Sequence, residues 1–107
     1  MIDPIKCLEF MQASAPKLAQ AKANVVLLEE GLKSVKAIQM KKHAGMPVSA
    51  QEREALASEE YQIAIKGVSA AVQEYEQIKA LFNVAQTKVE VWRSMESSNR
   101  AMDRGAR

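Results

Sequence analysis

Apolar residues recur at intervals of three and four along the second half of the chain. The stretch from Ser58 to Met102 contains no proline and one interior glycine, Gly67. Its apolar positions are, in order, Tyr61, Ile65, Val68, Val72, Tyr75, Ile78, Phe82, Ala85, Val89 and Trp92. This spacing keeps side chains on one face of an α-helix. The sequence therefore predicts one long helix over residues 58–102.

The predicted face changes phase once. Val72, Tyr75 and Ile78 are separated by three and three, whereas a heptad repeat alternates three and four. Such a stammer overwinds a coiled coil locally. We therefore expect the packing partner of the long helix to change near Tyr75.

The first half of the chain predicts two helices. Asp3 followed by Pro4 is typical of a helix start, because the carboxylate caps the first turn and proline lacks an N–H that would have no partner. A short helix over residues 3–14 follows. Pro16 disfavours helical geometry at the preceding residue, so we expect a break or kink there and a second helix over residues 16–43. The second helix carries a heptad seam typical of coiled coils, at Leu18, Ala21, Val25, Leu28, Leu32 and Val35.

A glycine and a proline then interrupt the pattern in residues 44–48, which predicts a turn. After it, Ser49 and Glu52 have the spacing of a capping box, in which the side chain of each residue accepts a hydrogen bond from the backbone N–H of the other. Ser58, followed by two glutamates, offers a second helix start. Residues 49–57 are therefore predicted as either a short separate helix or the first turns of the long one.

Helix lengths constrain the architecture. At 1.5 Å per residue the second helix is about 42 Å long and the long helix about 65 Å. Packed antiparallel across the turn, the second helix would cover its partner only to about Ala85. Phe82 lies near that limit and Val89 and Trp92 lie beyond it, so these three residues are the predicted contact surface for the first helix or for another subunit.

The predicted fold is thus an all-α, coiled-coil-like antiparallel helical hairpin, with a very long C-terminal helix and a short N-terminal helix. It forms a single domain over residues 1–107. Small chains of this size gain stability from burial beyond their own core, so we expect a homo-oligomer.

Composition limits the binding partners and the cellular compartment that we expect for this chain. The formal net charge is only +2, so attraction to nucleic acid or membrane must come from how the charges are distributed. Cys7 is the only cysteine, which excludes an intrachain disulfide and favours a reducing compartment. No apolar run approaches the roughly 20 residues that span a bilayer, and the N-terminus lacks the apolar stretch of a secretion signal. We expect a soluble cytoplasmic protein without a membrane partner.

The sequence contains no arrangement of residues that indicates a catalytic site. His43 lacks a partner constellation for metal binding or general base catalysis, and Cys7 is interpreted as a small core residue. Glu29 and Glu30 are adjacent in sequence, as are Glu59 and Glu60, so the side chains of each pair point in different directions on a helix and do not form a catalytic carboxylate pair. No glycine-rich phosphate loop and no zinc-ligand spacing occur. We expect no enzymatic activity, no metal and no cofactor.

Two groups of basic residues are the candidate nucleic-acid contacts. Lys33, Lys36, Lys41 and Lys42 make residues 33–43 basic, although lysines at a helix C-terminus are also explained by the helix dipole. Arg93, Arg100, Arg104 and Arg107 are spaced by seven, four and three, which places them on one face of a continuing helix.

Guanidinium groups suit phosphate oxygens, and the neighbouring Trp92 could stack on a base. In the alternative interpretation Trp92 continues the apolar core. Glu90, Glu96 and Asp103 would then partly balance arginines that only solvate the helix end.

Three segments, which together extend over most of the chain, carry a family resemblance: Lys33-Ser34-Val35-Lys36-Ala37; Gln51-Glu52-Arg53-Glu54-Ala55-Leu56-Ala57-Ser58-Glu59-Glu60-Tyr61; and Val89-Glu90-Val91-Trp92-Arg93-Ser94 with Ser97-Ser98-Asn99-Arg100-Ala101-Met102-Asp103-Arg104. In these segments the chain resembles a group of small all-helical proteins of tailed bacteriophages and prophages. These proteins are similar in size and layout to UvsY-like recombination mediators, which bind single-stranded DNA, assemble as ring-like homo-oligomers and help to load a recombinase. The resemblance implies a role in phage recombination or replication in the cytoplasm of the bacterial host.

The leading hypothesis is a phage helical oligomer that binds single-stranded DNA, with a recombinase as a further partner. Its proposed DNA contacts are Lys33, Lys36, Lys41, Lys42, Arg93, Arg100 and Arg104. One alternative is a protein-binding module, such as a phage inhibitor of a host defence or regulatory protein, which would dock Val89 and Trp92 into a groove of its partner. Another is a passive coiled-coil assembly protein.

Overall fold

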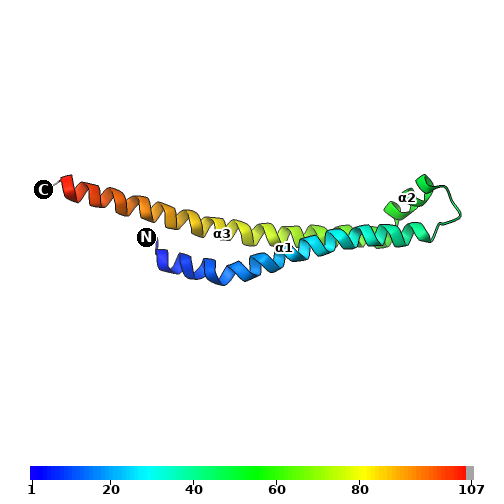
Figure 1. Ribbon diagram of the computed structural model, residues 1–107, viewed down its shortest axis with the longest axis horizontal. Coiled ribbons are helices and arrows are strands. Elements are labelled where there is room, and N and C mark those ends of the chain that lie inside the picture. The colour runs from blue at the N-terminus through cyan, green and yellow to red at the C-terminus, as the bar shows by residue number, and fades with distance from the viewer. Residues whose placement is uncertain (106–107) are drawn as a thin grey trace. The chain divides into compact units, whose positions relative to one another are not determined.

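The computed structural model describes residues 1–105, so Arg107 lies outside the described residues. The described residues form three α-helices and no strand (Figure 1). These are α1 (Pro4–Lys41), α2 (Val48–Ala57) and α3 (Glu59–Gly105). The predicted all-α fold with a very long C-terminal helix is confirmed.

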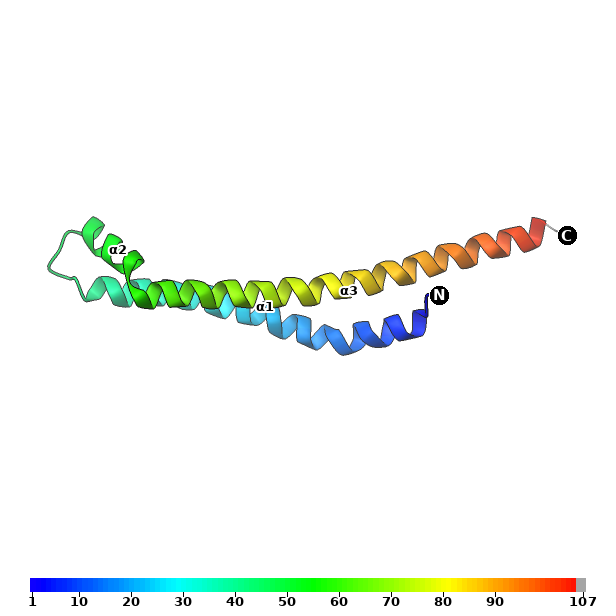
Figure 2. The same cartoon turned by 180° about the vertical axis from the view of Figure 1, so that it is seen from behind.

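The described chain divides into two compact units, and both long helices pass from one to the other. The first unit contains Met1–Leu18 and the described part of Gln77–Arg107, and the second contains Ala19–Glu76. In the second unit, α1 and the start of α3 lie side by side as an antiparallel hairpin, with α2 at its closed end (Figure 2).

α1 begins as the sequence predicts. The Asp3 Oδ1 atom accepts hydrogen bonds from the backbone N–H groups of Ile5 (3.1 Å) and Lys6 (3.2 Å). The carboxylate therefore satisfies amides of the first turn that have no partner inside the helix.

Of the break or kink expected at Pro16, the structure has no break. Pro16 lies inside α1, so the separate short helix over residues 3–14 is not formed. A proline in a helix interior removes one backbone hydrogen bond, here to the carbonyl of Gln12, at a cost of about 3 kcal/mol. Ser14 is buried, and Met11 and Leu18 are half-buried on the same face. Packing on both sides of Pro16 explains why the helix continues through it.

The turn between α1 and α2 is held by a side chain that the sequence did not single out. α1 ends at Lys41, and the N–H groups of Lys42 and His43 donate to carbonyls three residues earlier, at 3.2 and 3.0 Å. The Gln51 Nε2 atom then donates to the carbonyl of Met46 at 2.8 Å. This amide fixes the loop onto the first turn of α2.

Of the two predicted alternatives for residues 49–57, the structure has the separate helix. The capping box proposed at Ser49 is not formed, because Pro47 is the N-cap of α2 and no side chain caps it. Ser58 instead serves the α2–α3 junction. Its Oγ atom donates to the carbonyl of Ala55 (2.7 Å) and accepts from the N–H of Tyr61 (3.2 Å).

The buried face of α3 follows an unbroken heptad, so the predicted stammer is wrong. Its buried and half-buried apolar positions alternate three and four: Tyr61, Ala64, Val68, Ala71, Tyr75, Ile78, Phe82, Ala85 and Val89. Ala64 and Ala71 lie on this buried face in place of the predicted Ile65 and Val72, which are 39% and 36% exposed. Small residues such as alanine allow two helices to approach closely. A prediction based on the large apolar residues therefore places the buried face one position too late at these two sites.

The core of the described chain is built from small side chains. The buried apolar residues are Ala21, Ala55, Ala71 and Ala85, and no large side chain is fully buried. Dense packing of large side chains is therefore not what holds these helices together. Much apolar surface therefore stays exposed.

Candidate nucleic-acid interface

The predicted lysine group lies in the second unit, and two of its members are paired with carboxylates. Lys33 Nζ lies 3.0 Å from Glu30 Oε1 on the exposed surface of α1. Lys36 Nζ lies 2.6 Å from Glu52 Oε1 and joins α1 to α2. Lys41 and Lys42 are exposed, one at the last position of α1 and the other in the turn.

The Lys36–Glu52 pair stabilises both charges. The hydrogen bond to Glu52 raises the pKa of Lys36, an effect that slight desolvation opposes. The same hydrogen bond lowers the pKa of Glu52. Lys36 is therefore engaged in closing the hairpin, and a phosphate would have to compete with this carboxylate.

The predicted arginines lie in the first unit and share one helix. α3 continues to Gly105, so Arg93, Arg100 and Arg104 stand on one continuous helix at intervals of seven and four. We call these three residues the arginine edge. All three are exposed, and among the described residues no carboxylate lies within ion-pair distance of their guanidinium groups. The Arg104 Nε atom donates to the carbonyl of Arg100 at 3.5 Å, which keeps that side chain along the helix.

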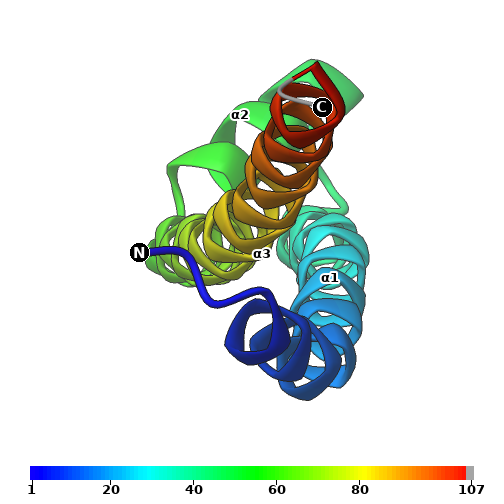
Figure 3. The same cartoon turned by 90° about the vertical axis from the view of Figure 1, so that its left-hand side faces the viewer.

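Trp92 lines a cleft in the same unit as the arginine edge. The chain segment that precedes α1 passes next to α3 here (Figure 3). The cleft has a volume of about 620 Å³ and is lined by Met1, Ile2, Asp3, Lys6, Cys7, Lys88, Trp92, Met95, Glu96 and Asn99. Trp92 is 36% exposed, so it is neither a closed core residue nor a free surface side chain. We call this site the Trp92 cleft.

The Trp92 cleft combines an aromatic wall with two ammonium groups, from Lys6 and Lys88. Two carboxylates also line it, but that of Asp3 is occupied in capping α1. An aromatic face next to cations is the combination that binds unstacked bases and their phosphates.

The other two predicted contact residues do not form a free surface. Phe82 and Val89 are half-buried at heptad positions of α3. The predicted overhang beyond Ala85 is also shorter than expected, because α1 starts at Pro4 and its first turns lie in the same compact unit as Lys88 and Trp92. Every described residue from Glu90 onward is nevertheless exposed.

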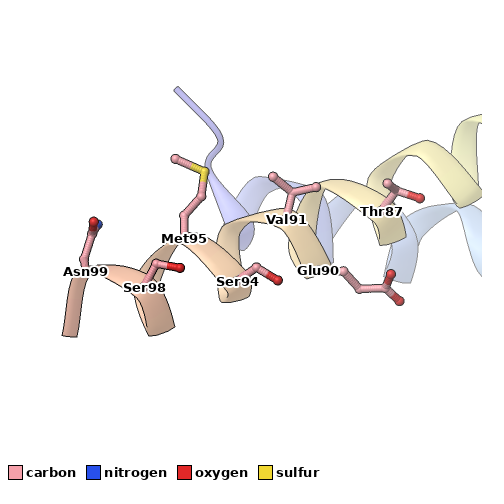
Figure 4. A pocket seen from close by; sticks show the side chains of 7 residues that line it. All are labelled: Thr87, Glu90, Val91, Ser94, Met95, Ser98 and Asn99. Carbon is pink, nitrogen blue, oxygen red and sulfur yellow. The ribbon is translucent and has the colours of Figure 1, made fainter. Parts of the chain in front are cut away.

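Sequence reasoning missed a second apolar face on α3. Leu81, Val84, Val91, Met95 and Met102 are all exposed, and together with Lys88 and Ser98 they recur at alternating intervals of three and four. We call these five apolar residues the second stripe. Figure 4 shows Val91 and Met95 projecting from the same side of α3, beside the hydroxyl groups of Ser94 and Ser98. In the sequence, stripe positions 81, 84, 88 and 91 each lie one residue before a predicted seam residue.

Within residues 1–105 no group of three histidine, cysteine, aspartate or glutamate side chains is arranged to hold a metal ion. None of the helices in this part of the chain is both long and apolar enough to cross a membrane. In comparisons with protein families, with curated proteins and with solved structures, nothing matches this chain.

Proposed function

We propose that the chain binds single-stranded DNA through the arginine edge. In this proposal it acts as a helical homo-oligomer in phage recombination or replication, in the manner of a recombination mediator. The observation that carries the proposal is the set of three exposed guanidinium groups on one helix with no carboxylate partner among the described residues. Each can bind a phosphate without first breaking an ion pair.

The Trp92 cleft supports a single strand over a duplex as the ligand. A base can stack on Trp92 only when it is unpaired and splayed out, and each such stacking contact contributes about 1–3 kcal/mol. Lys6 and Lys88 line the same cleft, where they can neutralise the phosphates on either side of that base.

The lysine group supports the proposal less. Lys33 and Lys36 would each have to exchange a carboxylate for a phosphate, which reduces the gain from binding. We therefore assign the main phosphate contacts to the arginine edge and treat the lysine group as the control.

The test uses Trp92 as its own reporter, because it is the only tryptophan in the chain. Quenching of its fluorescence by oligothymidine measures the Kd directly. Counterion release contributes about 0.7 log units per phosphate contact for each tenfold dilution of salt. R93Q/R100Q/R104Q is therefore expected to weaken binding about a hundredfold near 0.1 M salt, and to reduce the slope of log K against log salt by about 2.

The matched control is K33Q/K41Q/K42Q, which removes the same charge from the other unit. We expect it to change the Kd by less than about fivefold, since it leaves the three proposed phosphate contacts intact. Circular dichroism checks that both variants keep their helices. Equal losses in both variants would indicate a diffuse charge effect and contradict the proposal, as would absence of quenching by wild type at low salt.

A further inference from the structure

One flank of the first unit carries an apolar groove to which both of its helices contribute. The groove has a volume of about 270 Å³, and its apolar wall is formed by Phe10 of α1 with Leu81 and Val84 of α3. Leu81 and Val84 are each 51% exposed. Lys6 and Lys88 also line it. Large apolar side chains thus meet across two helices while half of their surface stays open.

The groove continues as the second stripe along α3. Val91 is 43% and Met95 55% exposed, in a segment where every described residue is exposed (Figure 4). The stripe has the same alternation of three and four as the seam that packs against α1. A heptad stripe is the pattern that packs against another helix. α3 therefore has two helix-packing faces in the first unit, of which α1 covers one.

The chain as a whole exposes enough surface for a further interface. The chain has an accessible surface of 8083 Å². A compact globular chain of 11.8 kDa exposes about 5,900 Å², so the excess is about 2,200 Å². A stable dimer of standard size buries about 800 Å² on each partner. The excess exceeds what one such interface takes from each chain.

We propose that this flank binds the same flank of a second copy of the chain. A two-fold axis needs only one patch that is complementary to itself, and a stripe of leucine, valine and methionine meets that condition. Phe10, Leu81 and Val84 of both copies then form the centre of a four-helix interface. The proposal deepens the oligomeric part of the proposed function by naming its surface, and it does not depend on DNA binding.

The lysines at the groove give this dimer a distinctive salt response. Lys6 and Lys88 of each copy approach those of the other, so like charges oppose association. Salt screens this repulsion, and the dimer is expected to tighten as salt rises. DNA binding by the arginine edge responds in the opposite direction.

The experiment is sedimentation equilibrium on the full chain without nucleic acid. Wild type is expected to be a dimer at micromolar concentration. L81E/V84E places two carboxylates per chain in the interface and is expected to raise the dimer Kd at least about a hundredfold. The matched control is N83E/Q86E, which adds the same charge at exposed positions of the same two turns, away from the groove. It should remain a dimer.

The proposal would be overturned by a monomeric wild type, by a dimeric L81E/V84E or by a control that dissociates equally. A monomeric wild type would indicate that the partner of this flank is a different protein. If L81E/V84E loses helicity by circular dichroism, V91E decides instead, because Val91 lies beyond the groove in the fully exposed segment. V91E is expected to raise the dimer Kd about tenfold, and an unchanged Kd would overturn the proposal. Loss of DNA binding with an intact dimer would contradict only the proposed function.

Discussion

The two units of the chain differ in what their polar side chains do. In the second unit, side chains join separate elements: Lys36 binds Glu52 across α1 and α2, and Gln62 Nε2 donates to the carbonyl of Leu56 across the α2–α3 junction at 2.9 Å. In the first unit, the hydrogen bonds of Asp3 and Arg104 stay within one helix. Its arginine edge and apolar groove are left exposed. The side chains that join separate helices thus lie in one unit, whereas the exposed arginine edge and apolar groove lie in the other.

The largest expected effect on folding stability comes from Pro16, in the first unit. P16A restores a backbone N–H that can donate to the Gln12 carbonyl inside α1. Proline in a helix interior costs about 3 kcal/mol relative to alanine, part of which is offset because proline also restricts the unfolded chain. We expect P16A to raise the free energy of unfolding by about 2 kcal/mol, measured by urea denaturation followed by circular dichroism.

Pro47 provides the control in the second unit. It precedes α2 with φ −57°, a conformation that proline adopts without strain, and it interrupts no helical hydrogen bond. P47A should lower the free energy of unfolding slightly, by about 0.5 kcal/mol, through a more flexible unfolded chain. A neutral or destabilising P16A would instead indicate that a helix starts at Pro16.

A smaller effect is expected at the α2–α3 junction. S58A removes the Oγ atom that caps α3 and binds the Ala55 carbonyl, and loss of an N-cap hydroxyl costs about 1 kcal/mol. S49A removes the hydroxyl of the capping box that is not formed, so its effect should stay within about 0.3 kcal/mol. Thermal unfolding of the two variants compares them directly. Equal destabilisation would mean that Ser49 does cap α2 in solution.

The sequence predicts the helical fold well because its strongest signals are local. The Asp3 cap, the stop near Gly45 and the heptad spacing each depend on a few neighbouring residues. The continuity of α1 through Pro16 was not predictable in this way, since it depends on packing around Ser14. The phase of the α3 seam is not predicted from the sequence, because Ala64 and Ala71 are less apolar than their neighbours Ile65 and Val72.

In the candidate site, too, local features were predictable from the sequence and features that depend on tertiary packing were not. Exposure of the arginines was predictable from their charge and spacing. The pairing of Lys36 with Glu52 was not, because it connects residues on two helices whose approach depends on the turn between them. The groove at Leu81 and Val84 was missed for a related reason. One helical pattern in the sequence predicts one packing face. A second packing face on α3 can be recognised only when the structure shows which face contacts α1.

The smallest expected effect is the pH dependence of the Lys36–Glu52 pair in the second unit. The pKa of Glu52 is lowered by the hydrogen bond from Lys36, so its contribution is present above its ordinary pKa of 4.5 and is lost as the pH falls through the lower folded value. The pKa of Lys36 is raised from 10.5, so its contribution is present below that value and is lost as the pH rises through the higher folded value.

The difference in melting temperature between wild type and E52Q should therefore form a plateau between these limits and vanish in acid. E54Q removes a neighbouring exposed carboxylate of α2 that has no ion-pair partner among the described residues, and should show no such plateau. Because both partners of the pair are partly open to solvent, the plateau will be low. If the E52Q difference persists unchanged below pH 4.5, the ion pair is not its cause, and the closure of the second unit then depends on the uncharged contacts of Gln51, Ser58 and Gln62.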